Sequence, residues 1–202
     1  MNPKKIVLFG VNADPPHLGH LQVVQELERL LGQGTQFIIM PTGQHPFDKP
    51  QVASKFDRLV MARLLFQGYS HVTVSDYEIN KNEKTYTLDT LIHLKSQFRR
   101  DRLYFVMAID VANHFFSWKE PEKICQIATP IIVSRVGYHL HQDIEEKLQK
   151  MCSPLILNTN SRDISSTEIR QELHQKKNPK DLPANLYEYI KSHHLYENLS
   201  IS

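Results

Sequence analysis

The sequence predicts a single α/β domain over residues 1–202, with a doubly wound parallel sheet of about five to six strands. Two observations lead to this fold class. Short unbroken apolar runs rich in β-branched and aromatic residues recur along the chain, as expected for strands covered on both faces. Longer segments with apolar residues at helical spacing lie between them. Strands and helices therefore alternate, and right-handed crossovers follow.

The elements can be placed in order along the chain. Residues 6–9 form the first apolar run, and residues 18–31 then repeat leucine and valine at helical spacing. Further strands are expected at 36–40, 71–74, 103–107, 129–134 and 154–157. Further helices are expected at 56–64, 87–98, 141–151, from 165 or 166 onward, and at 182–196. The expected N-caps are Ser54, Thr87, and Ser165 or Ser166. Arg58 lies on the polar side of its helix, where it is expected either in solvent or reaching back to the preceding loop.

Composition limits the classes of partner. The formal charge is +2 and the acids and bases are interspersed, so we expect no nucleic acid partner. No window approaches the roughly 20 apolar residues of a membrane helix, so no membrane partner is expected. The two cysteines, Cys125 and Cys152, have no metal spacing, which suits a reducing cytoplasm. The sequence leaves the oligomeric state open.

The most informative segment joins the first strand to the first helix at residues 10–20. Such a junction offers unpaired backbone N–H groups and the positive end of the helix dipole, which together favour a phosphate group. Gly10 allows the chain to turn directly after the strand. His17 and His20 place two imidazoles on one helix face, where they can donate hydrogen bonds to phosphate oxygens and can carry charge near neutral pH.

The histidine pair is also compatible with two simpler roles. Pairs at this spacing occur on plain surfaces or as half of a metal site. A zinc site needs a third or fourth ligand, and neither a CxxC nor an HExxH pattern accompanies the pair. The common phosphate-loop patterns, GxxxxGK followed by Ser or Thr and GxGxxG, are missing as well. The segment therefore indicates a phosphate site of another type.

The segment resembles the HxGH signature of the nucleotidyltransferase superfamily in its adenylyltransferase form, whose usual pattern is Gly-Gly-(Ser/Thr)-Phe-Asp-Pro-x-His-x-Gly-His. The chain departs from the pattern at Val11, Asn12 and Ala13. It keeps Gly10, Asp14, Pro15, His17, Gly19 and His20. The resemblance implies a Rossmann-like fold, with ATP bound by Gly10, Val11, Asn12, His17, Gly19 and His20. It also implies that Asn12 and Ala13 contact the second substrate.

Later segments extend the resemblance. TYTLDTL at residues 85–91 is similar to the nicotinate-mononucleotide adenylyltransferases in particular, where this segment helps to hold the pyridine mononucleotide. The resemblance also assigns the tryptophan to the nicotinate ring. ISSTEIR at residues 164–170 resembles the second phosphate-binding signature, with its arginine on the triphosphate. Implied substrate-binding residues here are Lys49, Thr85, Tyr86, Thr87, Trp118 and Arg135. Implied ATP-binding residues are Asp110, Ile164, Ser165, Ser166, Thr167 and Arg170.

The resemblance implies transfer of AMP from ATP to nicotinate mononucleotide, with Mg²⁺ bound alongside ATP and no metal held by the protein alone. The attacking phosphate has a second pKa of about 6 and is already mostly dianionic at neutral pH, so no protein nucleophile is needed. The hypothesis is that Mg²⁺ and four side chains screen the repulsion between the two anions. These catalytic residues are His17, His20, Lys49 and Arg170.

Three other classes of function stay open on the sequence alone. Another HxGH transferase, acting on phosphopantetheine or using CTP, is the runner-up. A nucleotide-binding regulator with impaired catalysis is suggested by the substitutions at Val11, Ala13 and Ala108. A histidine-rich metal carrier is the third class, because the chain has 11 histidines. The preference for nicotinate or nicotinamide mononucleotide is not evident from the sequence.

Overall fold

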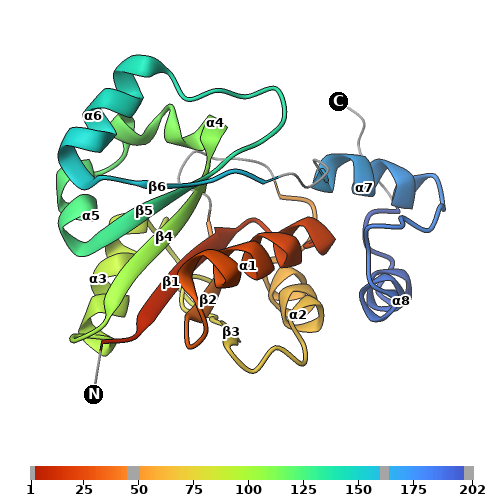
Figure 1. Cartoon of the computed structure of the whole chain (residues 1–202). Coiled ribbons are helices and arrows are strands. Elements are labelled where there is room, and N and C mark those ends of the chain that lie inside the picture. Colours follow the sequence, from red (N-terminus) through yellow and green to blue (C-terminus); the bar gives the residue numbers. More distant parts are fainter. Residues whose placement is uncertain (1–2, 45–50, 160–163, 198–202) are drawn as a thin grey trace.

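A six-stranded, fully parallel sheet forms the centre of the protein, with helices on both faces (Figure 1). The structure is a computed structural model that describes residues 3–44, 51–159 and 164–197. The strand order is β3-β2-β1-β4-β5-β6, so the direction of winding reverses between β1 and β4. The strands are β1 Lys5–Val11, β2 Gln36–Pro41, β3 Val72–Val74, β4 Arg102–Ala108, β5 Ala128–Val133 and β6 Leu155–Leu157.

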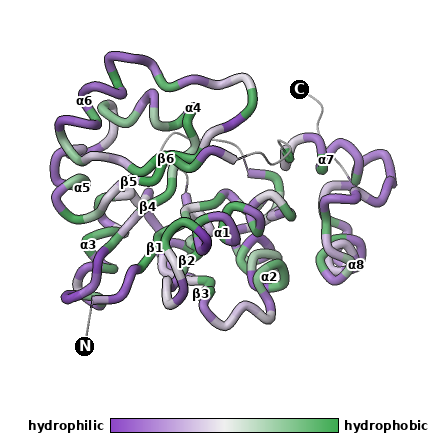
Figure 2. The backbone as a smooth tube through the Cα atoms, in the orientation of Figure 1, coloured by the Kyte–Doolittle hydropathy of each residue, from purple (hydrophilic) through white to green (hydrophobic). Residues whose placement is uncertain are grey.

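Successive side chains of a strand point to opposite faces, and the two faces are covered by different helices. Ile6 and Leu8 of β1 pack in a core with helices α3, α5 and α6, whereas Val7 packs with α1 and α2. Figure 2 shows apolar residues within the strands of the sheet, between more hydrophilic segments at the surface. The helices are α1 Leu18–Leu31, α2 Lys55–Leu65, α3 Thr87–Gln97, α4 Ile109–Ala112, α5 Pro121–Ile127, α6 Gln142–Cys152, α7 Ser166–His174 and α8 Ala184–Ser192, with a 3₁₀ turn η1 at Phe115–Ser117.

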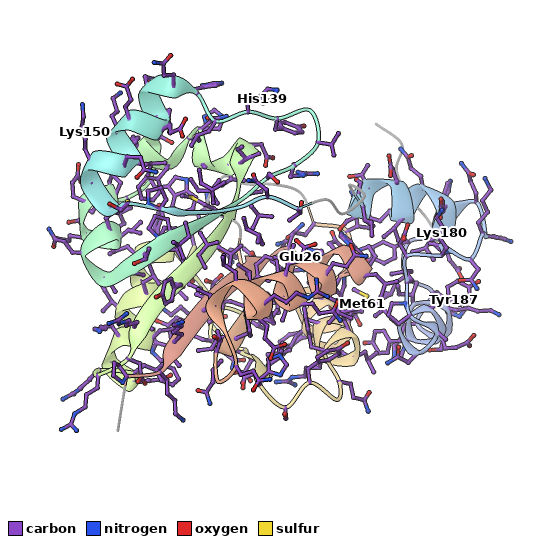
Figure 3. All side chains as sticks on the ribbon, in the orientation of Figure 1. Glu26, Met61, His139, Lys150, Lys180 and Tyr187 are labelled. Carbon is purple, nitrogen blue, oxygen red and sulfur yellow. The ribbon has the colours of Figure 1, made fainter. Side chains whose placement is uncertain are left out.

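A third core attaches the C-terminal helices to the rest of the molecule. Met61 of α2 packs with Ile169 of α7 and Leu186 of α8, and Tyr187 lies at the edge of this cluster. Figure 3 shows Met61 and Tyr187 on the facing elements. Helix α8 thereby lies beside α2, and α7 lies close to the start of α1 (Figure 1).

The expected fold class and the six expected strands are confirmed. Ser54 and Ser165 cap their helices by accepting hydrogen bonds from Asp57 N and Thr167 N. The N-cap of α3 is Tyr86, so the expected cap Thr87 is wrong by one position. The Tyr86 backbone N–H donates a hydrogen bond to the Asp89 carboxylate, as in a capping box.

Two further expectations about helices differ from the structure. Helix α5 is not among the expected helices, although Pro121 at its first position is a typical helix start. Its apolar pattern is only seven residues long, which is too short for helical periodicity to emerge. The closing helix ends at Ser192 instead of continuing to residue 196.

The carboxylate of Asp14 fastens the turn after β1 to two distant parts of the chain. It accepts hydrogen bonds from Val52 N at 2.7 Å and Ala53 N at 3.0 Å, at the entry to α2. It also accepts one from the Tyr196 hydroxyl at 2.8 Å. Asp14 is 1% exposed, so these three donors replace the water that a free carboxylate would keep. Burial and the neighbouring Asp14 carboxylate both raise the pKa of the Tyr196 hydroxyl.

We expect Tyr196→Phe to lower the free energy of unfolding by about 2 kcal/mol, because a buried carboxylate loses a donor while the ring remains in place. Urea denaturation measures the change. Tyr138→Phe is the matched control, since Tyr138 is 47% exposed and its loss of a hydroxyl should matter little. Equal stability of Tyr196→Phe and the wild type would contradict a structural role for this hydrogen bond.

Candidate active site

One large cavity of about 1100 Å³ opens at the carboxyl ends of the central strands. It is lined by the ends of β1, β4 and β5 and by the first turns of α1, α3, α4 and α7. This is the reversal point of the sheet, where ligands of doubly wound folds bind. The volume slightly exceeds that of a usual small-molecule pocket and leaves room for two substrates.

Nearly all of the sequence-predicted site residues meet at this cavity. Lys49 lies outside the described residues. Ala13 is the exception among the described ones, because its side chain is buried in the core below α1 and does not line the cavity. The lining includes Gly10, Val11, Asn12, His17, Gly19, His20, Thr85, Tyr86, Thr87, Asp110, Trp118, Arg135, Ile164, Ser165, Ser166, Thr167 and Arg170.

The two imidazoles at the start of α1 lie against each other, with ring centroids 4.0 Å apart. His17 is the N-cap residue and His20 is the third residue of the helix. The backbone N–H of His17 donates a hydrogen bond to His20 Nδ1 at 3.2 Å. Because Nδ1 accepts, the proton of the neutral His20 ring sits on Nε2, which is left to act as a donor.

Both histidines are neutral in this environment, so the expectation that either could carry charge near neutral pH is wrong. Burial, the neighbouring His20 and Arg135 lower the pKa of His17 to about 2. Burial lowers the pKa of His20 to about 4, against a smaller opposite effect of its hydrogen bond to the His17 backbone. Sequence spacing could place the rings together, but their desolvation follows only from the surrounding fold.

The start of α7 is joined directly to the turn that precedes α1. Ser166 Oγ donates to the Pro15 carbonyl at 2.9 Å, and Arg170 Nη1 donates to the Asp14 carbonyl at 2.6 Å. At Gly19 a Cβ atom would stand 3.0 Å from His17 Nδ1 and 3.3 Å from Ile164 Cβ, so the first turn of α1 leaves little room for a side chain. Two helix N-termini from distant parts of the chain therefore face the same cavity.

An acidic group and a basic group form an ion pair in the cavity lining. Asp110 lies in the first turn of α4, after the N-cap Ala108, and its Oδ2 pairs with Arg135 Nη1 at 3.4 Å. The other oxygen, Oδ1, is buried and has no hydrogen-bond partner among the described residues. The Arg135 guanidinium also lies over the Tyr138 ring at 5.5 Å.

Another part of the cavity lining, the aromatic end, is formed around Trp118. Trp118 packs on Phe115 and Phe105, with ring centroids 5.4 Å and 6.4 Å away. The Thr85 hydroxyl is buried nearby and has no hydrogen-bond partner within the described part of the chain. A flat apolar surface beside an unpartnered hydroxyl suits a planar ring that bears a polar substituent.

Comparisons with known proteins agree with this geometry. The model of the cytidylyltransferase-like family matches residues 8–172. A probable nicotinate-nucleotide adenylyltransferase of Idiomarina loihiensis is 32% identical, over 94% of this chain and 98% of its own. The chain belongs to the nicotinate-nucleotide adenylyltransferase family. A probable enzyme of the same name from Nitratiruptor sp. is 33% identical to this family member, over 86% of this chain and 90% of its own.

The adenylyltransferase fold is also seen in a solved structure. The nicotinic acid mononucleotide adenylyltransferase of Plasmodium falciparum, complexed with NaAD, is similar with a TM-score of 0.79 and 23% identity. The similarity covers 96% of this chain and 98% of the Plasmodium chain. Among the described residues of this adenylyltransferase family member, no helix is long and apolar enough to cross a membrane.

Sequence reasoning missed several residues at the site. One of them is Glu78, which lines the cavity. Burial raises the pKa of its carboxyl, and hydrogen bonds from the Thr90 hydroxyl at 2.7 Å and from the Gly43 backbone oppose this effect. The Gly43 backbone passes so close that a Cβ there would stand 2.2 Å from the Glu78 carbonyl oxygen. Lys119 pairs with Asp89 at 3.3 Å at the aromatic end. Further lining residues of this kind are His114, Ser134 and Thr159.

Of the two expected positions for Arg58, the one at the preceding loop is confirmed, and the side chain is buried there at 0% exposure. Its Nη1 donates to the Asn12 carbonyl at 2.7 Å and its Nη2 to the Thr42 carbonyl at 2.6 Å. Burial lowers the pKa of the guanidinium, and the negative charge of Asp14 opposes this effect. No signal in the local sequence separates this arginine from a solvated one.

The lowered pKa of His17 predicts how stability depends on pH. An unfolded histidine binds a proton below pH about 6.5, whereas the folded one stays neutral, so stability is present above that pH and is lost as the pH falls. Between about pH 7.5 and about pH 5.5 the wild type should lose about 1 kcal/mol more of its free energy of unfolding than His17→Gln does. Urea denaturation at the two pH values measures the difference. Equal losses would mean that His17 titrates normally in the folded protein.

Proposed function

We propose that this protein transfers AMP from ATP to nicotinate mononucleotide, forming nicotinate adenine dinucleotide and pyrophosphate in NAD biosynthesis. The names of its relatives support this substrate pair. The convergence of the α1 and α7 N-termini on one cavity carries the proposal, because two such ends suit a nucleoside triphosphate. The aromatic end around Trp118 gives the pyridine ring a place to stack.

The reaction needs no covalent intermediate on the protein. A phosphate oxygen of the mononucleotide forms a bond to the α-phosphorus of ATP, and the bond from that phosphorus to the bridging oxygen of pyrophosphate breaks. With a second pKa of about 6, the attacking phosphate is already mostly dianionic at neutral pH, so no general base is required. Catalysis then consists of holding two anions in line and stabilising the charge that develops on the departing pyrophosphate.

Neutral hydrogen-bond donors and helix ends do most of this work in the proposed mechanism. His20 Nε2–H and the backbone N–H groups at the start of α1 meet the phosphates, and the histidines act as donors rather than as cations. Arg170 adds positive charge beside the α7 N-terminus, where it is already held by the Asp14 carbonyl. Lys49 is proposed to add a second cation on the resemblance of its loop alone.

The donor set around Asp110 fits a Mg²⁺ ion that enters with ATP. Mg²⁺ in nucleotide sites is usually held by one or two carboxylates, waters and substrate phosphates. Asp110 offers a buried oxygen without a partner, and no three His, Cys, Asp or Glu side chains gather elsewhere in the described part of the chain. Bound there, the ion would neutralise charge on the phosphates and polarise the bond that breaks.

The proposal is tested by product formation. The purified protein is incubated with ATP and Mg²⁺ and with nicotinate mononucleotide, nicotinamide mononucleotide or phosphopantetheine, and pyrophosphate release and product mass are measured. We expect release with a pyridine mononucleotide and a product of the dinucleotide mass. Release only with phosphopantetheine would indicate the runner-up transferase. Binding of ATP without release of pyrophosphate from any substrate would indicate a regulator.

His20→Ala should lower turnover by about 10²-fold at saturating ATP, because the variant loses one preorganised donor to the developing charge. His71→Ala is the matched control, since this histidine pairs with Glu28 away from the cavity and should leave turnover unchanged. Steady-state kinetics at saturating concentrations of both substrates measures the effect. Full turnover of His20→Ala would remove this residue from the mechanism.

A further inference from the structure

A chain of side-chain hydrogen bonds runs from the protein interior to the cavity wall. It begins at Arg58, whose Nη2 donates to Gln51 Oε1 at 3.1 Å. Gln51 Nε2 in turn donates to Asn12 Oδ1 at 2.8 Å. Asn12 follows β1 directly and lines the cavity just before the turn that begins α1. The same arginine also holds the Asn12 carbonyl, so both the backbone and the side chain of Asn12 are anchored.

Arg58 sets the direction of both hydrogen bonds in this series. A guanidinium has donors only, so the atom of Gln51 that faces Arg58 must be the amide oxygen. The Gln51 nitrogen must then face Asn12, and it requires an acceptor there. Asn12 therefore presents its oxygen to Gln51. Its Nδ2 group, with two N–H donors, is left without a protein acceptor among the described residues.

We propose that Arg58 and Gln51 are positioning residues that fix the orientation of the Asn12 amide, so that its Nδ2 donors face a substrate phosphate in the cavity. This inference rests on the proposed function for the identity of the phosphate. An unconstrained asparagine could turn its oxygen toward the phosphate and repel it. Arginine stays protonated throughout the working pH range, so the orientation does not change with pH.

The proposal also accounts for a departure from the family pattern. The pattern has serine or threonine at the position of Asn12, and a hydroxyl can rotate to present either a donor or an acceptor. An amide cannot adapt in this way without turning over. A chain that carries asparagine here therefore needs a neighbour that selects one of the two orientations, and Gln51 occupies that place at 2.8 Å.

The decisive variant is Gln51→Glu. A carboxylate accepts from Arg58 and also accepts from Asn12 Nδ2, so the Asn12 amide should turn over and present its oxygen to the cavity. We expect kcat/KM for the mononucleotide to fall about 10-fold or more, with unchanged thermal stability. Gln44→Glu adds the same charge on a nearby exposed loop without contacting Asn12, and it is the matched control. It should stay within about 2-fold of the wild type.

A double variant separates the effect of the Asn12 amide orientation from the effect of the added negative charge. In Asn12→Ser the hydroxyl can rotate, so adding Gln51→Glu should lower kcat/KM by less than about 3-fold relative to Asn12→Ser alone. An equal loss of kcat/KM in the wild-type and Asn12→Ser backgrounds would show that only the new charge acts. It would overturn the proposal that Gln51 orients Asn12. Calorimetric titration of the wild type, the two single variants and the double variant measures the affinity for each substrate, and so tests the orientation of Asn12 independently of turnover. A wild type that binds both substrates but releases no pyrophosphate would contradict the proposed function. The affinities of the four proteins would then still decide whether Gln51 orients Asn12.

Discussion

The arrangement of the site depends on holding two helix N-termini at one cavity. Both ends carry partial positive charge, so bringing them together is unfavourable until an anion binds between them. The carbonyls of Asp14 and Pro15 offset this, because they accept hydrogen bonds from Arg170 and Ser166 at the start of α7. The Asp14 carboxylate fixes the same turn to the entry of α2 and to Tyr196. Contacts within the protein itself thereby hold the two helix N-termini at the cavity.

The neutral state of the histidine pair shapes the chemistry of that site. A cation at His17 or His20 would have to lose its hydration, and at His17 it would also be repelled by Arg135, so both rings stay neutral. Neutral rings still donate hydrogen bonds, and the His17 backbone directs the donor of His20 by occupying Nδ1. Among the described residues, positive potential at the cavity then comes from peptide N–H groups, from the arginines and from Lys119.

Much of the fold could be predicted because its signals are local. Buried strands need apolar residues on both faces, which produces unbroken runs such as residues 6–9. The start of α7 could be placed because Ser165 caps it within two residues. Where the local signal is short or ambiguous, prediction failed, as at α5 and at the cap of α3. The motifs at residues 10–20 and 164–170 likewise located two parts of the cavity lining, because each motif is continuous in sequence.

The sequence by itself determined that strands and helices alternate and that two helix starts carry motifs resembling phosphate-binding signatures, since spacing and capping act within a few residues. Tertiary structure alone decided how those starts meet and which buried groups support them. Tyr196 reaches Asp14 across 182 positions, and Arg58 reaches the Asn12 carbonyl across 46. It also decided the charge of His17 and His20, because desolvation depends on everything that packs around a side chain and not on its neighbours in the chain.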